Sequence, residues 1–135
     1  MPLRIVLVRH GRSSFNVERR IQGRDDLSTL TEEGARQARR TGEALADIPL
    51  TAVYSSPLRR ARDTTELLLQ AHGSRLQPNF SDDLLEIDLE PWSGLLRSEL
   101  IRLDPEAERL WRLQPHRLEL QRHDGSRHRP VPALL

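Results

Sequence analysis

The stretch "LRIVLVRHGRSSFN", residues 3–16, sets a run of aliphatic side chains directly against Arg-His-Gly-Arg. Continuous β-branched and aliphatic runs are typical of central strands in parallel sheets, because both faces of such strands are buried. We therefore predict a buried strand over Leu3 to Arg9, with the polar turn that follows at its carboxyl end. Ligands bind at this end of the strands in open α/β folds, so the turn is the first candidate for a functional site.

The text "TEEGARQARRTGEALAD", residues 31–47, has the features of a helix. Thr31 is a suitable N-cap residue, and Glu32 and Glu33 favour the positive end of the helix dipole. Glycine or alanine stands at positions 34, 38 and 42. Because these small residues recur on one face, we expect the helix to lie close against a sheet.

The alternation of strand and helix then continues. "TAVYSS", residues 51–56, predicts a short second strand, and Pro57 opens a helix that Gly73 ends. "RLQPNF", residues 75–80, is a candidate third strand. This order of elements predicts an α/β fold with a parallel sheet.

The second half of the chain is less regular. "SDDLLEIDLEPW", residues 81–92, predicts a long functional loop, and a short helix is expected over residues 94–103. Asp104 and Pro105 are suited to begin a further helix, as its N-cap and its first residue. An Asp124-Gly125 turn then predicts a hairpin between "HRLELQR" and "SRHRPV".

A chain of 135 residues has the usual size of one domain, and its 21 basic and 20 acidic residues give a formal net charge of +1. This balance argues against a general binder of nucleic acids or membrane surfaces, so any positive site must be local. The apolar run over residues 3–8 is too short for a signal peptide or a membrane span. We therefore expect a cytoplasmic protein.

The chain has no cysteine, and all of its 21 basic residues are arginine. These absences exclude a cysteine-nucleophile phosphatase, a thiolate zinc site, a P-loop nucleotide site and a lysine Schiff base. Codon bias is the simplest explanation of the arginine usage. The functional explanation, that guanidinium forks suit phosphate, concerns only particular arginines.

Arg9, His10 and Gly11 match what phosphoryl transfer requires, which is forked donors for the phosphate and a nucleophile in line with the leaving oxygen. Imidazole is nucleophilic only through an unprotonated nitrogen, so we expect the other nitrogen of His10 to donate to a backbone carbonyl. Gly11 would let the backbone approach closely. The alternative is a charged strand end with a turn glycine, and the tripeptide alone does not decide between the two.

Two further residues extend the candidate site. Arg60 begins the helix after the second strand, and because the carboxyl ends of parallel strands lie side by side, it would join Arg9. The alternative for Arg60 is a solvated helix residue, as we expect for Arg59 and Arg62. Glu86 lies among apolar neighbours, where a carboxyl group can hold a proton for a leaving group. Surface charge is the alternative for Glu86, and the pattern alone favours it.

Four stretches, "LVRHGRSSFN", "IQGRDDLSTLTEEGARQA", "VYSSPLRRARDT" and "LLEIDLEPWSGL", resemble the histidine phosphatase superfamily, also called phosphoglycerate mutase-like, in their order and spacing. The resemblance covers residues 3–113. "PHRLEL" and "DGSRHRPVPALL", in an arginine-rich tail or hairpin over residues 114–135, are similar to a later stretch of some bacterial phosphatases. The resemblance implies an α/β fold of three layers, a mostly parallel sheet with helices on both faces. We expect residues 1–135 to form a single domain of this kind, incomplete at its C-terminus.

The resemblance also implies roles for individual residues. His10 would carry the phosphoryl group in a covalent intermediate, and Glu86 would protonate the departing alcohol and then help water to attack. Binding of the phosphoryl oxygens is implied for Arg9, Asn16 and Arg60, and substrate binding for Gln22 and Gly23. No metal and no cofactor are implied.

One feature of the family is missing from the sequence. The family places a second histidine, in a His-Gly pair after a late core strand, opposite the nucleophile. The other His-Gly pair here, His72-Gly73, has the pattern of a helix end with a C′ glycine, which favours a structural role. His116, His123 and His128 follow no apolar strand and are expected at the surface. We therefore expect a truncated or frameshifted chain with an unpaired sheet edge.

The leading hypothesis is a metal-independent phosphatase that hydrolyses a small phosphorylated metabolite through phospho-His10, weakened by loss of the C-terminal part. One alternative is a catalytically impaired phosphate-binding remnant. Another is a phosphotransferase of the phosphoglycerate mutase type, which is disfavoured because returning the phosphoryl group needs a closed, water-poor site. No nucleic-acid or membrane partner is expected, and the exposed sheet edge predicts a homodimer.

Overall fold

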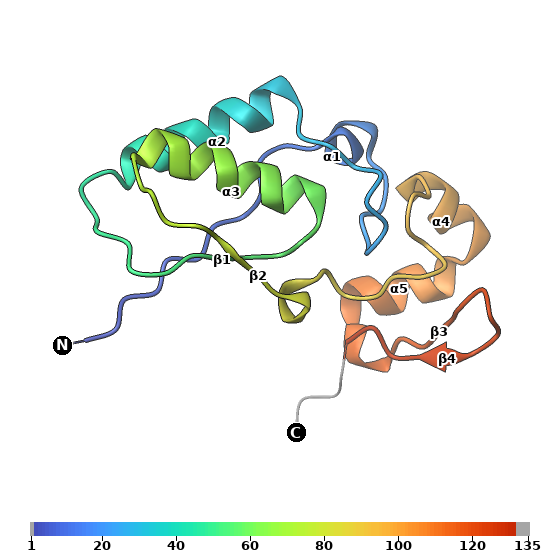
Figure 1. Cartoon of the computed structure of the whole chain (residues 1–135). Coiled ribbons are helices and arrows are strands. Elements are labelled where there is room, and N and C mark those ends of the chain that lie inside the picture. The colour runs from blue at the N-terminus through green and yellow to red at the C-terminus, as the bar shows by residue number, and fades with distance from the viewer. Residues whose placement is uncertain (1, 132–135) are drawn as a thin grey trace.

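The computed structural model describes residues 2–131 (Figure 1). Its elements, in chain order, are α1 (Ser14–Glu18), α2 (Glu32–Ala44), β1 (Tyr54–Ser55), α3 (Arg59–His72), β2 (Asn79–Phe80), the 3₁₀ turn η1 (Asp82–Leu84), α4 (Arg97–Leu103), α5 (Pro105–Leu113), the 3₁₀ turn η2 (Pro115–Arg117), β3 (Leu120–Gln121) and β4 (Arg127–His128). Of the helices in this described part, none is long and apolar enough to cross a membrane.

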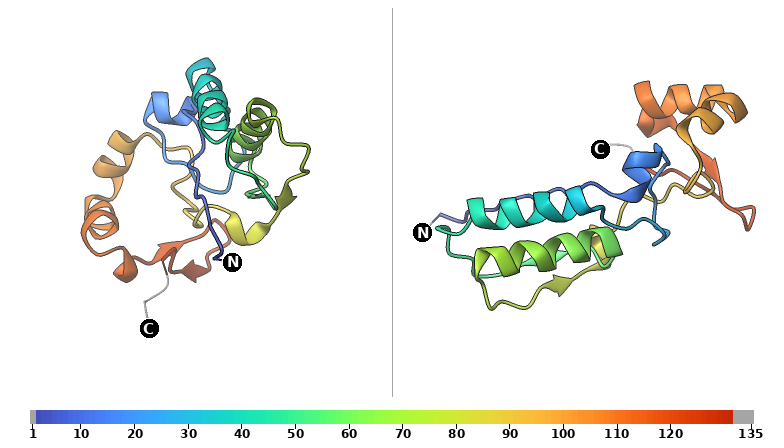
Figure 2. Two further views of the ribbon diagram at one scale, coloured as in Figure 1. Left: turned by 90° about the vertical axis from the view of Figure 1, so that its left-hand side faces the viewer. Right: turned by 90° about the horizontal axis from the view of Figure 1, so that it is seen from above.

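Helices α2 and α3 lie side by side next to the extended N-terminal segment and β1 (Figures 1 and 2). Thr31 caps α2 as predicted, because its hydroxyl accepts a hydrogen bond from Gly34 N at 3.0 Å. The small face of α2 is buried, but its partners differ from the prediction. A Cβ on Gly42 would overlap the carbonyl oxygen of Leu68 in α3, and a Cβ on Gly34 would overlap that of Arg12. The small residues therefore admit a neighbouring helix as well as the N-terminal segment.

The predicted burial of Leu3 to Arg9 is wrong. No backbone hydrogen bond within residues 2–131 pairs this segment with another strand. Its side chains are largely exposed, with 84% of Leu3 and 92% of Leu7 accessible to solvent. A central strand is buried only when other strands cover its edges and other layers cover both faces. In the described part of the chain, α2 and α3 lie beside the segment over residues 3–9, and no strand pairs with it. The segment therefore stays exposed.

The two further predicted strands are present but short. β1 and β2 pair in parallel, with Tyr54 opposite Asn79 and Ser55 opposite Phe80. Helix α3 connects them and ends at Gly73, whose φ of 83° is the left-handed conformation that glycine adopts most readily. This strand, helix and parallel strand confirm the α/β unit that the sequence predicts.

The predicted hairpin is also present. β3 and β4 are antiparallel, with Leu120 opposite His128 and Gln121 opposite Arg127. The last four residues of "DGSRHRPVPALL" lie outside the described residues.

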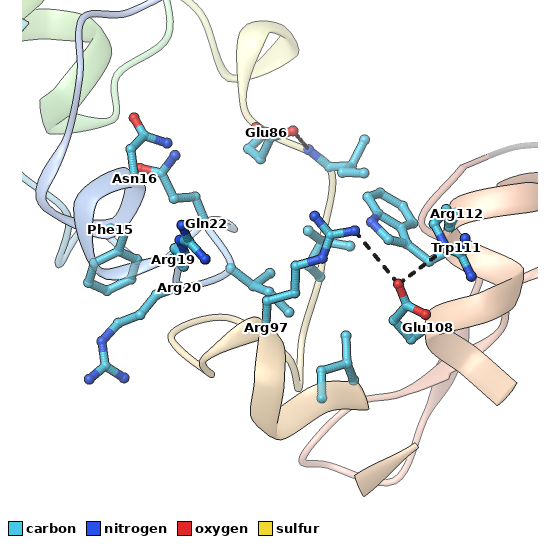
Figure 3. A pocket seen from close by; sticks show the side chains of 14 residues that line it. Phe15, Asn16, Arg19, Arg20, Gln22, Glu86, Arg97, Glu108, Trp111 and Arg112 are labelled. Carbon is cyan, nitrogen blue, oxygen red and sulfur yellow. Dashed lines mark hydrogen bonds and ion pairs between the residues drawn. The ribbon is translucent and has the colours of Figure 1, made fainter. Parts of the chain in front are cut away.

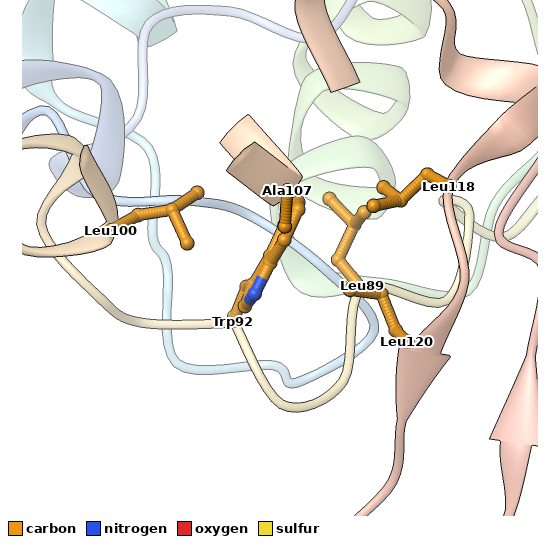
Figure 4. Packing of buried hydrophobic residues seen from close by; sticks show 6 residues of the cluster. All are labelled: Leu89, Trp92, Leu100, Ala107, Leu118 and Leu120. Carbon is orange, nitrogen blue, oxygen red and sulfur yellow. The ribbon is translucent and has the colours of Figure 1, made fainter. Parts of the chain in front are cut away.

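A second group of elements, α4, α5 and the β3–β4 hairpin, packs around the loop that carries Glu86. Its apolar cluster consists of Leu89, Trp92, Leu100, Ala107, Leu118 and Leu120 (Figure 4). Trp92 meets Trp111 of α5 edge to face, with ring centroids 6.3 Å apart. Asp104 caps α5 as predicted, accepting from Ala107 N at 3.0 Å. The loop over residues 85–92 is therefore anchored by its apolar side chains.

Candidate active site

His10 stands at the end of the extended N-terminal segment and is partly buried. Its Nδ1 lies 2.7 Å from the carbonyl oxygen of Gly11. Because a carbonyl oxygen can only accept, Nδ1 carries the hydrogen and Nε2 of the neutral ring keeps its lone pair. The predicted orientation of the ring by a backbone carbonyl is confirmed.

Burial of the ring lowers the pKa of His10 from its ordinary value. The Gly11 carbonyl raises it, the positive charges of Arg60 and Arg9 lower it, and the Glu86 carboxylate raises it, with a net lowering. A lowered pKa keeps the imidazole neutral at lower pH. The site therefore favours the nucleophilic form of the ring.

Gly11 is the point at which three segments meet. A Cβ on Gly11 would overlap the carbonyl oxygen of Gly34, which confirms the expected need for a close backbone approach. The Gly11 N–H donates to the hydroxyl of Thr64 at 3.0 Å, and that hydroxyl donates to the carbonyl of Arg60 at 2.6 Å. This role of Thr64 is not among the predictions from the sequence. The signal available was its position four residues after Arg60, on the same face of the helix.

Arg60 is buried, with 3% of its surface exposed, and it is not the solvated helix residue that was its alternative. Its Nη2 donates to the carbonyl of Gly23 at 3.1 Å and lies 4.0 Å from Oε2 of Glu86. Its Nη1 is buried and has no hydrogen-bond partner in the described part of the chain. Arg59 is exposed, as expected. Arg60 thus presents a fixed positive charge with one donor unused.

Arg9 is exposed, and no hydrogen bond to its side chain occurs within residues 2–131. Its charge lies close enough to His10 to lower the pKa of the ring. The structure therefore brings Arg9, His10 and Arg60 together.

Glu86 faces this group from the loop after η1. Its side chain is 41% exposed, which agrees with the surface position that the sequence pattern alone favours and not with enclosure by apolar neighbours. Its backbone carbonyl accepts from Nε of Arg24 at 2.7 Å, and its Oε1 accepts from Ile87 N at 3.0 Å. Nothing in the sequence pattern indicates the contact with Arg24.

Asn16 and Gln22 are joined through Ser13, which is fully buried. Asn16 Oδ1 accepts from Ser13 N at 3.0 Å, and Gln22 Oε1 accepts from Ser13 Oγ at 2.6 Å. Gly23, the next predicted residue, uses its carbonyl to hold Arg60.

A cavity of about 680 Å³ lies beside these residues (Figure 3). Asn16, Gln22 and Glu86 line it on one side, and α4 and α5 line it on the other. Figure 3 shows Glu108 of α5 between Arg97 and Arg112, at 3.7 and 3.6 Å. His10, Arg9 and Arg60 are not among its lining residues. Glu86, which lines the cavity, lies 4.0 Å from Arg60 and so links the two groups of residues. The cavity is of a size suited to a small organic molecule.

No hydrogen bond joins His10 to another histidine of the described part. His72 lies 2.8 Å from the carbonyl of Ile48, consistent with the structural role expected from the sequence. The predicted surface position of His128 is wrong, because its side chain is only 10% exposed and lies 2.9 Å from the Asp88 carbonyl. The folding back of the hairpin onto the Glu86 loop causes this burial. Residues 2–131 contain no group of three or more His, Cys, Asp or Glu side chains that could hold a metal ion.

Comparison with known proteins shows which fold and which family this chain has. A solved structure, that of YhfR from Bacillus stearothermophilus, superposes with a TM-score of 0.72 at 41% identity, over 80% of this chain and 52% of that one. The fold is therefore that of the phosphoglycerate mutase-like α/β proteins. A model of the histidine phosphatase superfamily (branch 1) matches residues 5–131. The chain belongs to this superfamily.

Two curated relatives are similar over most of this chain. The probable 2-carboxy-D-arabinitol-1-phosphatase of Arabidopsis thaliana is 38% identical over 120 residues, which is 89% of this chain and 24% of that protein. Phosphoserine phosphatase 1 of Hydrogenobacter thermophilus is 37% identical over 119 residues, 88% of this chain and 55% of that protein. The chain thus spans about a quarter and about half of these two relatives.

Proposed function

We propose that the protein is a phosphatase that hydrolyses a small phosphorylated metabolite through a phosphohistidine on His10, without a metal ion. The observation that carries this proposal is the His10 ring, whose Nδ1 is bound to the Gly11 carbonyl while burial and two arginines lower its pKa. A neutral imidazole held in this way has one free nucleophilic nitrogen. Two relatives that carry the name phosphatase support the reaction class.

In the first step, the Nε2 lone pair of His10 attacks phosphorus and the bond from phosphorus to the ester oxygen breaks. Arg60 and Arg9 stabilise the charge on the phosphoryl oxygens. Glu86 gives its proton to the departing alcohol, which leaves the carboxylate and a phosphoryl group bonded to His10.

In the second step, a water molecule replaces the alcohol. The Glu86 carboxylate takes a proton from the water, its oxygen attacks phosphorus, and the bond from phosphorus to nitrogen breaks. Inorganic phosphate leaves, His10 is again neutral and Glu86 is again protonated. Asn16 and Gln22 line the cavity, and we expect them to contact the substrate.

The experiment is phosphate release from a panel of sugar, amino-acid and glycerate phosphates, with and without a chelator. We expect release from at least one ester, unaffected by the chelator and abolished in His10→Ala. Brief incubation with a labelled ester followed by quenching should leave an acid-labile, alkali-stable label on His10. A label that survives in His10→Ala would show that another residue is the nucleophile.

A second candidate function is phosphate binding without turnover. One observation favours it: the side chain of Glu86 is 41% exposed. In that case the protein would bind inorganic phosphate but release none from any ester. A phosphotransferase would instead deliver the phosphoryl group to an added alcohol, so analysis of the products separates all three functions.

A further inference from the structure

Ser13 and Ser28 are almost fully buried, with 0% and 1% of their surfaces exposed. Their hydroxyl oxygens both approach the same atom, Oε1 of Gln22, at 2.6 and 2.8 Å. These serines come from two segments that meet on either side of Gln22. Two buried hydroxyl groups directed at one amide oxygen can fix the orientation of that amide.

The donors and acceptors determine which way the Gln22 amide points. Ser13 Oγ already accepts from Asn16 N at 3.2 Å, and Ser28 Oγ accepts from Phe15 N at 3.4 Å. The hydrogen of each hydroxyl is therefore free to go to Gln22 Oε1. If the amide were turned over, its NH₂ group would face both hydroxyls and leave their hydrogens without an acceptor in a buried place, which is unfavourable. The Nε2H₂ group of Gln22 must therefore face the other way.

The Asn16 amide is oriented by the same serine. Its Oδ1 accepts from Ser13 N at 3.0 Å, so its Nδ2H₂ group remains as a donor. Neither Gln22 Nε2 nor Asn16 Nδ2 has a hydrogen-bond partner in the part of the chain that the structure describes. Both side chains line the cavity, and Figure 3 shows them at the same edge of it. Two NH₂ groups, those of Gln22 and Asn16, are thus oriented as hydrogen-bond donors at the edge of the cavity and have no acceptor in the described residues.

We propose that Ser13 and Ser28 are positioning residues that hold the amides of Gln22 and Asn16 as a pair of donors toward a phosphoryl group. The inference rests on the proposed function only for the identity of the acceptor. Ionised phosphoryl oxygens only accept hydrogen bonds, so an amide that presented its own oxygen would repel them. A fixed amide avoids that state, and it also avoids the loss of side-chain freedom on binding.

Binding of inorganic phosphate to the full chain, measured by calorimetry, tests the proposal in Ser28→Ala. We expect the dissociation constant to rise about 2- to 10-fold, as for loss of one net hydrogen bond. Ser14→Ala is the matched control, because its hydroxyl accepts from Thr29 N at 3.1 Å in the same pair of segments but contacts neither amide. It should leave phosphate affinity unchanged. If Ser28→Ala does not fold, Ser28→Cys replaces it, since a thiol is a weaker donor.

A double-mutant cycle separates positioning from a general structural effect. If Ser28 acts through Gln22, Ser28→Ala should not weaken phosphate binding further in a Gln22→Ala background. An equal loss in both backgrounds would overturn the proposal.

Nuclear magnetic resonance tests the orientation without any ligand. The Gln22 side-chain amide should be as rigid as the backbone in the parent chain and mobile in Ser28→Ala. If the parent binds no phosphate, the proposed function fails, while this measurement still decides the orientation. Unchanged Gln22 signals in Ser28→Ala would refute it.

Discussion

The His10 ring is held through one nitrogen, and this single hydrogen bond determines its chemistry. Nδ1 donates to the Gly11 carbonyl, so rotation of the ring would break a 2.7 Å contact. Arg60 supplies charge from a buried position, which costs solvation and is offset in part by the carboxylates of Glu86, Asp25 and Asp26. The two arginines beside the ring thus differ in burial, since Arg60 is buried and Arg9 is exposed.

The pH dependence of phosphorylation at His10 follows from the lowered pKa of its ring. The neutral ring is the nucleophile, and a lowered pKa preserves it to lower pH. On the acid side, single-turnover phosphorylation should therefore fall as the pH drops through a midpoint below the ordinary histidine pKa of about 6.5. Titration of the His10 ring by nuclear magnetic resonance should give the same midpoint. A midpoint at or above that of a histidine in an unfolded peptide would contradict the burial argument.

Replacement of Glu86 should slow hydrolysis most for esters that have a poor leaving group. General acid catalysis contributes about 10² to 10⁴-fold where the leaving group needs a proton. Glu86→Gln should therefore slow hydrolysis of an alkyl phosphate strongly and that of p-nitrophenyl phosphate little. Glu90→Gln, in the same loop, is the control and should change neither rate. Equal losses on both esters in Glu86→Gln would count against the acid role.

At the scale of elements, the β3–β4 hairpin is bound to the loop that carries Glu86. Asp88, two residues after Glu86, accepts from Nε of Arg122 at 3.0 Å, and its carbonyl contacts His128. Burial raises the pKa of Asp88, but hydrogen bonds from Glu90 N and Arg122 outweigh it, so the pKa lies below its ordinary value. The hairpin therefore contributes a charged contact that complements the apolar packing of the loop.

Arg122→Ala should loosen the Glu86 loop. Amide hydrogen exchange of residues 86–92 should become faster, because loss of the ion pair leaves Asp88 partly buried without its charged partner. Arg127→Ala is the matched control, since Arg127 is in the same hairpin but is 69% exposed and pairs with Glu119. Exchange that is unchanged in Arg122→Ala would show that the apolar cluster alone positions the loop.

At the scale of the whole molecule, the extended N-terminal segment exposes a run of apolar side chains. Leu3, Ile5 and Leu7 are 84%, 71% and 92% exposed, and the backbone of this segment has no strand partner within residues 2–131. Exposed apolar strands with free edges favour pairing between chains. We therefore propose that two copies associate through residues 3–8.

Leu7→Lys should weaken this association. Light scattering coupled to size-exclusion chromatography should show a mass that rises with concentration for the parent chain and stays near the monomer for Leu7→Lys. Leu27→Lys is the control, because Leu27 is 72% exposed but lies outside the segment. A parent chain that remains monomeric at all concentrations, or equal effects of the two substitutions, would refute the proposal.

Structural features with local causes can be predicted from the sequence alone. Thr31 caps α2, Asp104 caps α5 and Gly73 ends α3, because each signal acts within one turn of its helix. The orientation of His10 belongs to the same group, since its acceptor is the next residue along the chain.

Features that depend on segments far apart in the sequence cannot be predicted from local patterns. The aliphatic run over residues 3–8 is exposed although its pattern predicts a buried strand, because burial depends on the neighbours of a strand and not on the strand itself. Thr64 reaches Gly11 across 53 residues, and Arg60 reaches Gly23 across 37, so no local pattern could pair them. The direction of the Gln22 amide likewise follows from two buried hydroxyls, those of Ser13 and Ser28. Ser28 carries no motif of its own, so the sequence does not indicate its contact with Gln22.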